Sequence, residues 1–145
     1  MAYLHGFLSA EECDHIIALG RDGGALHPSR VVNYAGEVGE RSVARTSESC
    51  RVSACNDVVV MRAVQRAAYL TGLTPAHAEA VQVVHYDAGQ QYRPHFDFFS
   101  PRDVNYERKC DRQGNRLVSV FAYLSGCEGG GRTYFPNLRV GFAPE

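Results

Sequence analysis

The sequence predicts an α+β domain in which helices pack on one side of an antiparallel β-sandwich or jelly roll. Two observations support this prediction: helical patterns dominate the first half of the chain, and short extended stretches separated by turns follow from Glu79 onward. The chain has 145 residues, of which 45% are hydrophobic, and this is enough apolar material for the core of one ordinary domain. We therefore expect residues 1–145 to belong to a single domain.

The first expected helix begins at Ser9, within the stretch FLSAEECDHIIALGR. Serine is a preferred N-cap residue, and Glu12, three positions later, completes a capping box. Apolar side chains follow at Ile16, Ile17 and Leu19. We expect the helix to end in the glycines that come next, Gly20, Gly23 and Gly24.

A second helix is expected over residues 58–70, after a mixed region that includes the β-prone piece SRVVNY at 29–34. Asn56 or Asp57 supplies the N-cap, and Gly72 and Pro75 close the helix. The apolar side chains on or near one face of this helix are Val60, Met61, Val64, Ala67 and Ala68.

The β-rich half begins with AVQVVHY at residues 80–86. Alternate residues of a strand face opposite sides, so Val81, Val83 and His85 point one way and Tyr86 points the other. The next piece, DAGQQ, is typical of a turn. YRPHFDFF, at residues 92–99, then predicts a second extended stretch, in which proline favours a sheet edge.

The remaining residues complete the predicted β-rich half. A long polar loop covers residues 100–116, and RLVSVFAYL at 116–124 is expected to form a third strand. GCEGGG at 126–131 is a glycine-rich turn, and residues 132–144 supply one or two more short strands. Helices first and strands later is the order on which the α+β prediction depends.

Charge and composition exclude several classes of protein. The net charge is −1 and the basic residues are scattered, which argues against a nucleic-acid surface. We expect no membrane span and no signal peptide, because neither pattern occurs in the sequence. The five cysteines are irregularly spaced, which favours reduced thiols in a cytoplasmic protein. The alternative is an oxidising lumen in which Cys50 and Cys55 pair.

His95 and Asp97 stand two residues apart in the aromatic stretch VQVVHYDAGQQYRPHFDFF. Residues i and i+2 of a strand share a face, so this imidazole and carboxylate can occupy two adjacent positions on one octahedral metal ion. Two histidines and one carboxylate, with open positions beside them, are the ligands of non-haem Fe(II) oxygenases. A structural zinc site would close four ligands and use more cysteine. The alternative is a surface polar pair, because a His-x-Asp pattern by itself is common.

Several segments resemble, in the same order, the prolyl 4-hydroxylase type of Fe(II)/2-oxoglutarate dioxygenases, and in particular the catalytic domain of the prolyl 4-hydroxylase alpha subunit. These segments are GFLSAEECDHII, ARTSES, the helix ending in YLTGLTPAHAE, AEAVQVVHYDAGQQYRPHFDFF and NRLVSVFAYLSGCEGGGRTYFPN. The resemblance runs from about Phe7 to Asn137. It implies a double-stranded β-helix, or jelly-roll, core with supporting N-terminal helices.

The resemblance also implies roles for individual residues. His95 and Asp97 match the first two iron ligands. Tyr86 matches the tyrosine that helps to hold the distal carboxylate of 2-oxoglutarate, and Thr133 matches a threonine of the same pocket. The competing interpretations are a core tyrosine bonded to a backbone carbonyl and an ordinary strand threonine. His85 points away from Tyr86, and we expect it to be satisfied locally and not to be a ligand.

Three further residues, Glu79, Tyr92 and Arg116, match positions that line the peptide groove of prolyl hydroxylases. The competing interpretations are a surface carboxylate at position 79 and a solvated charge at position 116. The resemblance thus implies a dioxygenase that binds Fe(II), 2-oxoglutarate and O₂, uses ascorbate as a reductant, and hydroxylates a peptide, with prolyl residues as the first choice. The alternatives are a non-catalytic module for a Pro-rich peptide and a hydroxylase of a free amino acid or other small molecule.

No histidine follows His95, so the sequence offers no third iron ligand, and no basic anchor for 2-oxoglutarate can be assigned. The family places both groups later in its fold. We therefore expect a jelly roll that lacks its last strands, and little activity from these 145 residues alone. The alternatives are a complementing C-terminal segment or second chain that donates the strands, and a degenerate relative that has lost the chemistry.

Overall fold

The computed structural model describes residues 1–22, 26–30, 43–103, 106–110 and 114–144. Some predictions fall outside these residues: Gly23 and Gly24 as helix-ending residues, positions 31–34 of SRVVNY, and positions 104–105 and 111–113 of the polar loop. The described part contains two long helices and two small antiparallel sheets, which is compatible with the predicted α+β class.

The main sheet has three antiparallel strands in the order β1–β2–β3. Their bounds are His27–Pro28, Glu48–Val52 and Val81–His85. The first two strands lie between the long helices in the sequence, so the chain does not strictly place helices first. In the register of β2 and β3, Cys50 lies opposite Val83, and both side chains are buried.

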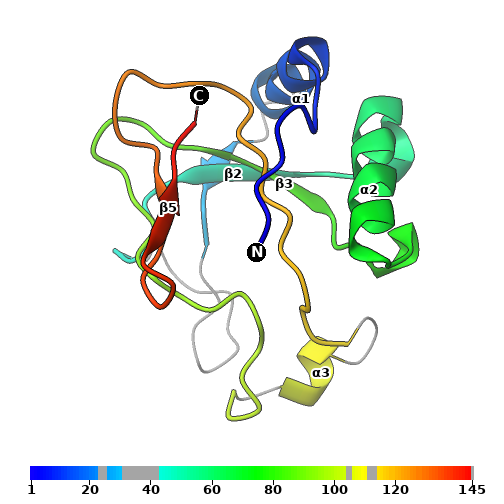
Figure 1. The fold of residues 1–145 in the computed structure, drawn as a ribbon, viewed down its shortest axis with the longest axis vertical. Helices are drawn as coiled ribbons and strands as arrows, with labels where there is room; N and C mark the ends of the chain where they lie inside the picture. Colours follow the sequence, from blue (N-terminus) through cyan, green and yellow to red (C-terminus); the bar gives the residue numbers. More distant parts are fainter. Residues whose placement is uncertain (23–25, 31–42, 104–105, 111–113, 145) are drawn as a thin grey trace.

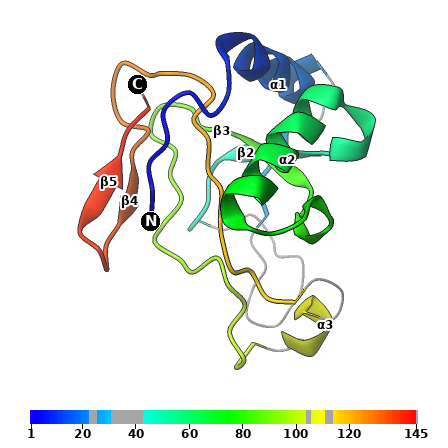
Figure 2. The same ribbon diagram turned by 45° about the vertical axis from the view of Figure 1, so that its right-hand side comes forward.

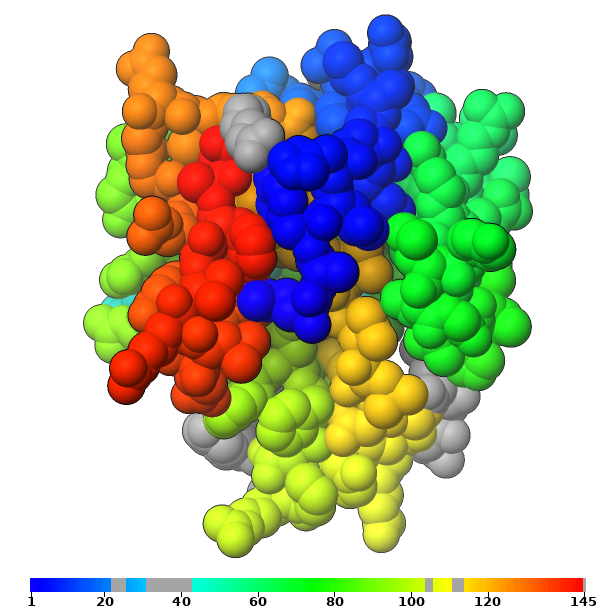
Figure 3. Space-filling view, in the orientation of Figure 1, coloured from blue at the N-terminus to red at the C-terminus, as the bar shows by residue number. Residues whose placement is uncertain are grey.

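The second sheet is a hairpin of β4, Thr133–Phe135, and β5, Val140–Phe142, as predicted for this end of the chain. The two long helices lie on one side of the molecule and the hairpin lies on the other (Figures 1 and 2). The N-terminal segment, blue in Figure 3, crosses the face between them. Tyr3 of this segment stacks on Phe142, with 5.0 Å between ring centroids and 4° between planes.

The first long helix, α1, spans Ala10–Asp22 and begins with the predicted capping box. The N–H of Ser9 donates to the Glu12 carboxylate over 2.9 Å, and the N–H of Glu12 donates to the Ser9 hydroxyl over 3.2 Å. The prediction that Gly20 ends the helix is wrong, because α1 continues past it. A Cβ at Gly20 would lie 3.1 Å from Cγ1 of Val83, so the glycine permits close packing on β3.

The second long helix, α2, spans Val58–Thr71 and is capped by Asp57, one of the two predicted N-cap residues. Oδ1 of Asp57 accepts from the N–H groups of Val59 and Val60 at 2.9 and 3.0 Å. Its other oxygen lies 2.7 Å from Nε2 of His15 in α1. One carboxylate therefore caps α2 and joins the two helices.

The core lies where both helices meet the main sheet. Its buried side chains, one each from α1, β2, α2 and β3, are Ile16, Cys50, Val60 and Val83. On the predicted apolar face of α2, Val60 and Ala68 are buried whereas Met61 is exposed. Gly72 closes α2 as predicted, in the left-handed region with φ of 70°.

Two predicted strands, at residues 92–99 and 116–124, do not form in the described structure. The first makes an isolated bridge between Tyr92 and Arg45, and the second joins no sheet among the described residues. Pro94 has no N–H to donate to a ladder. Along 117–121 the apolar side chains stay exposed, with Leu117 at 81%, whereas Leu124 is partly buried against the core. These two strand predictions are wrong, and a jelly-roll core is not confirmed.

Shorter elements connect these parts. The 3₁₀ turns η1 and η2 span Ala54–Asn56 and Pro75–His77, and a short helix, α3, spans Tyr106–Cys110 inside the predicted polar loop. The predicted turn after β3 is present, closed by a 3.0 Å bond from the N–H of Gln90 to the carbonyl of Asp87. All five cysteines are free thiols. Within the described residues, no helix has the length and apolar character needed to cross a bilayer.

Candidate metal and co-substrate site

The predicted ligands His95 and Asp97 meet in a loop and not in a strand. Nε2 of His95 lies 3.2 Å from Oδ1 of Asp97, and the side chains are 39% and 52% exposed. Two ligand atoms at about 2.1 Å from one metal ion, and at right angles to each other, lie about 3.0 Å apart. The pair therefore fits two adjacent positions of one octahedral ion.

The other ring nitrogen of His95, Nδ1, makes a hydrogen bond that fixes the orientation and the tautomer of the imidazole. Nδ1 lies 2.9 Å from the backbone carbonyl oxygen of Arg93, which can only accept, so Nδ1 carries a proton. In the neutral ring the free lone pair is then on Nε2, the atom that faces Asp97. The His95 ring also stacks on Tyr92, with centroids 3.7 Å apart, and the Arg45 guanidinium lies 4.8 Å from the Tyr92 ring. Burial raises the pKa of Tyr92.

Three side chains from residues 115–119 hold the loop that carries Asp97. The Ser119 hydroxyl donates to Oδ2 of Asp97 over 2.5 Å. Nη1 of Arg116 donates to the backbone carbonyl of Asp97 over 3.0 Å. The Asn115 amide accepts from the N–H of Phe99 and donates to its carbonyl, both over 2.8 Å. These bonds link two segments that share no β-ladder.

Glu79 and Arg116, both predicted to line a peptide groove, bind each other. Nε and Nη2 of Arg116 donate to the two oxygens of Glu79 over 2.5 and 2.8 Å, which makes a two-pronged ion pair. The hydrogen bonds from Arg116 lower the pKa of the Glu79 carboxyl, outweighing the effect of burial, and Glu79 raises the pKa of Arg116. Arg116 therefore couples the predicted groove residue Glu79 to the backbone of Asp97, a predicted metal ligand.

The two predicted co-substrate contacts have different surroundings. Tyr86 is exposed, and its hydroxyl makes no hydrogen bond within the described residues. The Thr133 hydroxyl lies 2.9 Å from the hydroxyl of Tyr123. The Tyr123 hydroxyl also accepts from the N–H of Thr133 over 3.1 Å and donates to the carbonyl of Phe142 over 2.7 Å. The roles of Tyr86 and Thr133 toward 2-oxoglutarate stay predictions.

A second His-x-Asp pair has the same separation but less support. Nε2 of His85 lies 3.2 Å from Oδ1 of Asp87, and these side chains are 45% and 67% exposed. Within the described residues, Nδ1 of His85 and Oδ2 of Asp87 make no further hydrogen bond. His85 is thus paired locally, as expected. Across the described ranges, no three His, Cys, Asp or Glu side chains gather to hold a metal ion.

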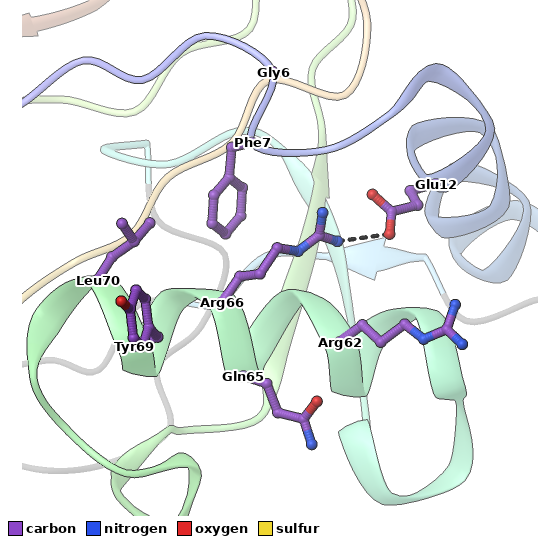
Figure 4. Close-up of a pocket in the computed structure, with 8 residues that line it drawn as sticks. All are labelled: Gly6, Phe7, Glu12, Arg62, Gln65, Arg66, Tyr69 and Leu70. Carbon is purple, nitrogen blue, oxygen red and sulfur yellow. Dashed lines mark hydrogen bonds and ion pairs between the residues drawn. The ribbon is translucent and has the colours of Figure 1, made fainter.

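An open hollow of about 610 Å³ lies between the N-terminal segment and α2, and none of the predicted site residues lines it (Figure 4). Its lining residues are Gly6, Phe7, Glu12, Arg62, Gln65, Arg66, Tyr69 and Leu70. Nη2 of Arg66 donates to the Glu12 carboxylate over 2.6 Å, so the charge of this arginine is already paired. The hollow is therefore separate from the residues that are predicted to hold a metal ion.

The sequence prediction missed Asn115, Ser119 and Tyr123. Ser119 and Tyr123 carry the only hydroxyls of the apolar stretch LVSVFAYL. A polar group in an apolar stretch needs a partner when it is covered, and this signal could have marked Tyr123, which is half-buried, but not Ser119, which is exposed. Asn115 gave no signal, because it lies in the predicted polar loop, where asparagine is common.

Comparison with known proteins finds relatives along nearly the whole chain. It is 41% identical over 142 residues to probable prolyl 4-hydroxylase 6 of Arabidopsis thaliana, covering 95% of this chain and 46% of that protein. It is 40% identical to probable prolyl 4-hydroxylase 7 and 34% identical to prolyl 4-hydroxylase 5 of the same plant, covering 90% and 93% of this chain but 39% and 44% of those proteins. The chain thus spans less than half the length of these curated relatives. No protein-family model matches it.

Proposed function

We propose, because this chain belongs to the prolyl 4-hydroxylase family, that it functions in the Fe(II)- and 2-oxoglutarate-dependent hydroxylation of prolyl residues in a peptide. The observation that supports this most directly is the geometry of His95 and Asp97. Their facing atoms have the spacing of adjacent metal ligands, and their outer atoms are each held by a hydrogen bond. A donor set of imidazole nitrogen and carboxylate oxygen suits Fe(II).

Nε2 of His95 and Oδ1 of Asp97 are the atoms that would hold the iron. When bound, Fe(II) supplies the activation of O₂ with 2-oxoglutarate as co-substrate and ascorbate as reductant. The protein's own groups position ligands, bind the co-substrate and exclude water, and they do little acid–base work. Tyr86 and Thr133 would hold the distal carboxylate of 2-oxoglutarate through their hydroxyls.

The peptide substrate would lie along Glu79, Tyr92 and Arg116. Because Arg116 already makes two bonds to Glu79 and one to the carbonyl of Asp97, it would shape the groove more than pair with a charge on the peptide. One face of the Tyr92 ring stacks on the ring of His95. The largely apolar ring of proline can pack on an aromatic face of this kind.

Two protein ligands alone hold Fe(II) weakly, because Fe(II) stands low in the affinity order of divalent metals. A dianionic co-substrate in a partly buried pocket also needs a cationic partner. No third ligand is present among the described residues. Because no histidine follows His95 in the sequence, we propose that a complementing segment or a second chain supplies the third ligand and the basic anchor.

The second candidate function is a non-catalytic module that holds a Pro-containing peptide. The stacked rings of Tyr92 and His95 and the ion pair of Glu79 and Arg116 support this alternative, because they form without a metal ion. Peptide binding that persists without any consumption of 2-oxoglutarate would distinguish the module from the enzyme.

The test is succinate formation from 2-oxoglutarate by the natural full-length protein, with Fe(II), O₂ and a Pro-rich peptide. We expect His95→Ala and Asp97→Ala each to lower the rate by more than about 100-fold. His85→Ala is the matched control, because His85 faces Asp87 at the same 3.2 Å, and it should keep most of the activity. Turnover that survives His95→Ala, or an equal loss in His85→Ala, would overturn the proposed function.

A further inference from the structure

We propose that Ser119 is a positioning residue for the ligand Asp97, and that its hydroxyl selects which carboxylate oxygen faces the metal. The proposal rests on the proposed function, because it concerns the same ligand pair. Its test measures metal binding directly and needs no turnover.

The two carboxylate oxygens of Asp97 have different neighbours. Oδ2 accepts a hydrogen bond from the Ser119 hydroxyl over 2.5 Å, whereas Oδ1 lies 3.2 Å from Nε2 of His95. The terminal torsion of an aspartate is broad and roughly two-fold, so a carboxylate with no outer partner can exchange its oxygens. A hydrogen bond to Oδ2 fixes the plane of the carboxylate and leaves Oδ1 directed at His95.

The position of Ser119 is itself fixed by its neighbours in sequence. Asn115 bonds both backbone groups of Phe99, and Arg116 bonds the carbonyl of Asp97. These anchors lie four and three residues before Ser119, so they hold its segment beside the ligand loop although no β-ladder joins the two. Arg116 is in turn held by Glu79. The hydrogen bonds of Asn115 and Arg116 therefore hold the segment that places the Ser119 hydroxyl beside Asp97.

The pair of His85 and Asp87 shows the same motif without this support. Its nitrogen and oxygen are also 3.2 Å apart, but the Asp87 side chain is 67% exposed. Among the described residues, no hydroxyl bonds its second oxygen. The separation of the two ligand atoms is therefore common to both pairs, and the outer hydrogen bonds distinguish the pair of His95 and Asp97.

The test compares Ser119→Val with Ser119→Thr in the natural full-length protein. Threonine and valine have nearly the same shape, so the two variants differ mainly in the hydroxyl. Co(II) is titrated without O₂ or 2-oxoglutarate, and binding is followed by the visible absorption of the metal. We expect Ser119→Val to weaken Co(II) binding by about 10-fold or more, with an altered spectrum, and Ser119→Thr to stay within about threefold of the natural protein.

Ser53→Ala is the control, because Ser53 is exposed and its side chain makes no capping hydrogen bond. Equal Co(II) affinity of the valine and threonine variants would overturn the positioning role of the hydroxyl. In that case the proposed function stands if His95→Ala still abolishes Co(II) binding. Absence of Co(II) binding by the natural protein would overturn both proposals.

Discussion

The ion pair of Glu79 and Arg116 makes the stability of the candidate site depend on pH. Arg116 holds the pKa of the Glu79 carboxyl below its ordinary value of 4.5. A carboxyl whose pKa is lower in the folded chain than in the unfolded chain stabilises the fold above the unfolded pKa. That contribution is lost as the pH falls through the folded pKa. The pair therefore stabilises the fold at neutral pH and ceases to do so in acid.

Glu79→Gln removes the charge and keeps the size of the side chain. We expect it to lower Tm by about 2–4 °C at pH 7, and this difference should shrink progressively as the pH falls below 4.5, as measured by circular dichroism. Both side chains are partly exposed, so high salt should shrink the difference at pH 7. Glu128→Gln, at an exposed glutamate, is the control and should show no such pH dependence. A Tm difference for Glu79→Gln that keeps the same size as the pH falls from 7 through the acid range would contradict this role.

At the residue scale, the sequence predicts which neighbouring side chains can meet in the site, but it does not predict the contacts between distant segments. His95 and Asp97 were predictable because they are two positions apart, and even a loop keeps such neighbours within reach. The contacts of Asn115 and Ser119 span 16 and 22 residues. They depend on how two irregular segments lie together, and no periodicity in the sequence carries that information.

At the scale of helices and strands, local sequence signals predicted the helix starts correctly. The prediction that failed, the end of α1 at Gly20, involves a tertiary contact. The capping box at Ser9 and the cap at Asp57 are contacts within three residues, so the sequence alone predicts them. Gly20 was expected to end α1 because glycine commonly closes helices. Its function is instead to let α1 approach Val83 on a strand more than sixty residues away in sequence.

Gly20→Ala tests this close approach. In an exposed helix, alanine is more stable than glycine by about 1 kcal/mol. In α1 the new Cβ would lie 3.1 Å from Cγ1 of Val83 and 3.8 Å from Sγ of Cys50, both buried. Overpacking a buried contact costs about 1–3 kcal/mol. We therefore expect Gly20→Ala to lower the free energy of unfolding by about 1 kcal/mol net, measured by urea denaturation.

The matched experiment places Gly20→Ala in a Val83→Ala background, where the obstructing methyl groups are gone. There the substitution should become stabilising, because only the helix propensity remains. Stabilisation by Gly20→Ala in the natural background would show that α1 does not lie as close to β3 as the structure has it.

At the scale of the whole molecule, the core and the segment 116–124 differ in how far their apolar side chains are covered. Both long helices and the main sheet share the core of Ile16, Cys50, Val60 and Val83. The segment 116–124 instead exposes large apolar side chains, among them Leu117, Val118, Val120 and Phe121. Alternation of apolar residues shows which of them could share the face of a strand. It does not show which neighbouring strand supplies the hydrogen bonds, and this is why the third strand was predicted and does not form.

Amide hydrogen exchange should be slow in the main sheet and fast in the exposed segment. Amides of β2 and β3 are hydrogen-bonded over the core, so they exchange only through large openings of the structure. Residues 117–122 belong to no helix or sheet of the described structure, so we expect their amides to exchange about 100-fold or more faster than those of β3. Mass spectrometry of the 145-residue chain at pH 7 measures both, with the β4–β5 hairpin as an internal reference. Protection of 117–122 equal to that of β3 would mean that this segment is paired in solution, and that its apolar side chains are covered.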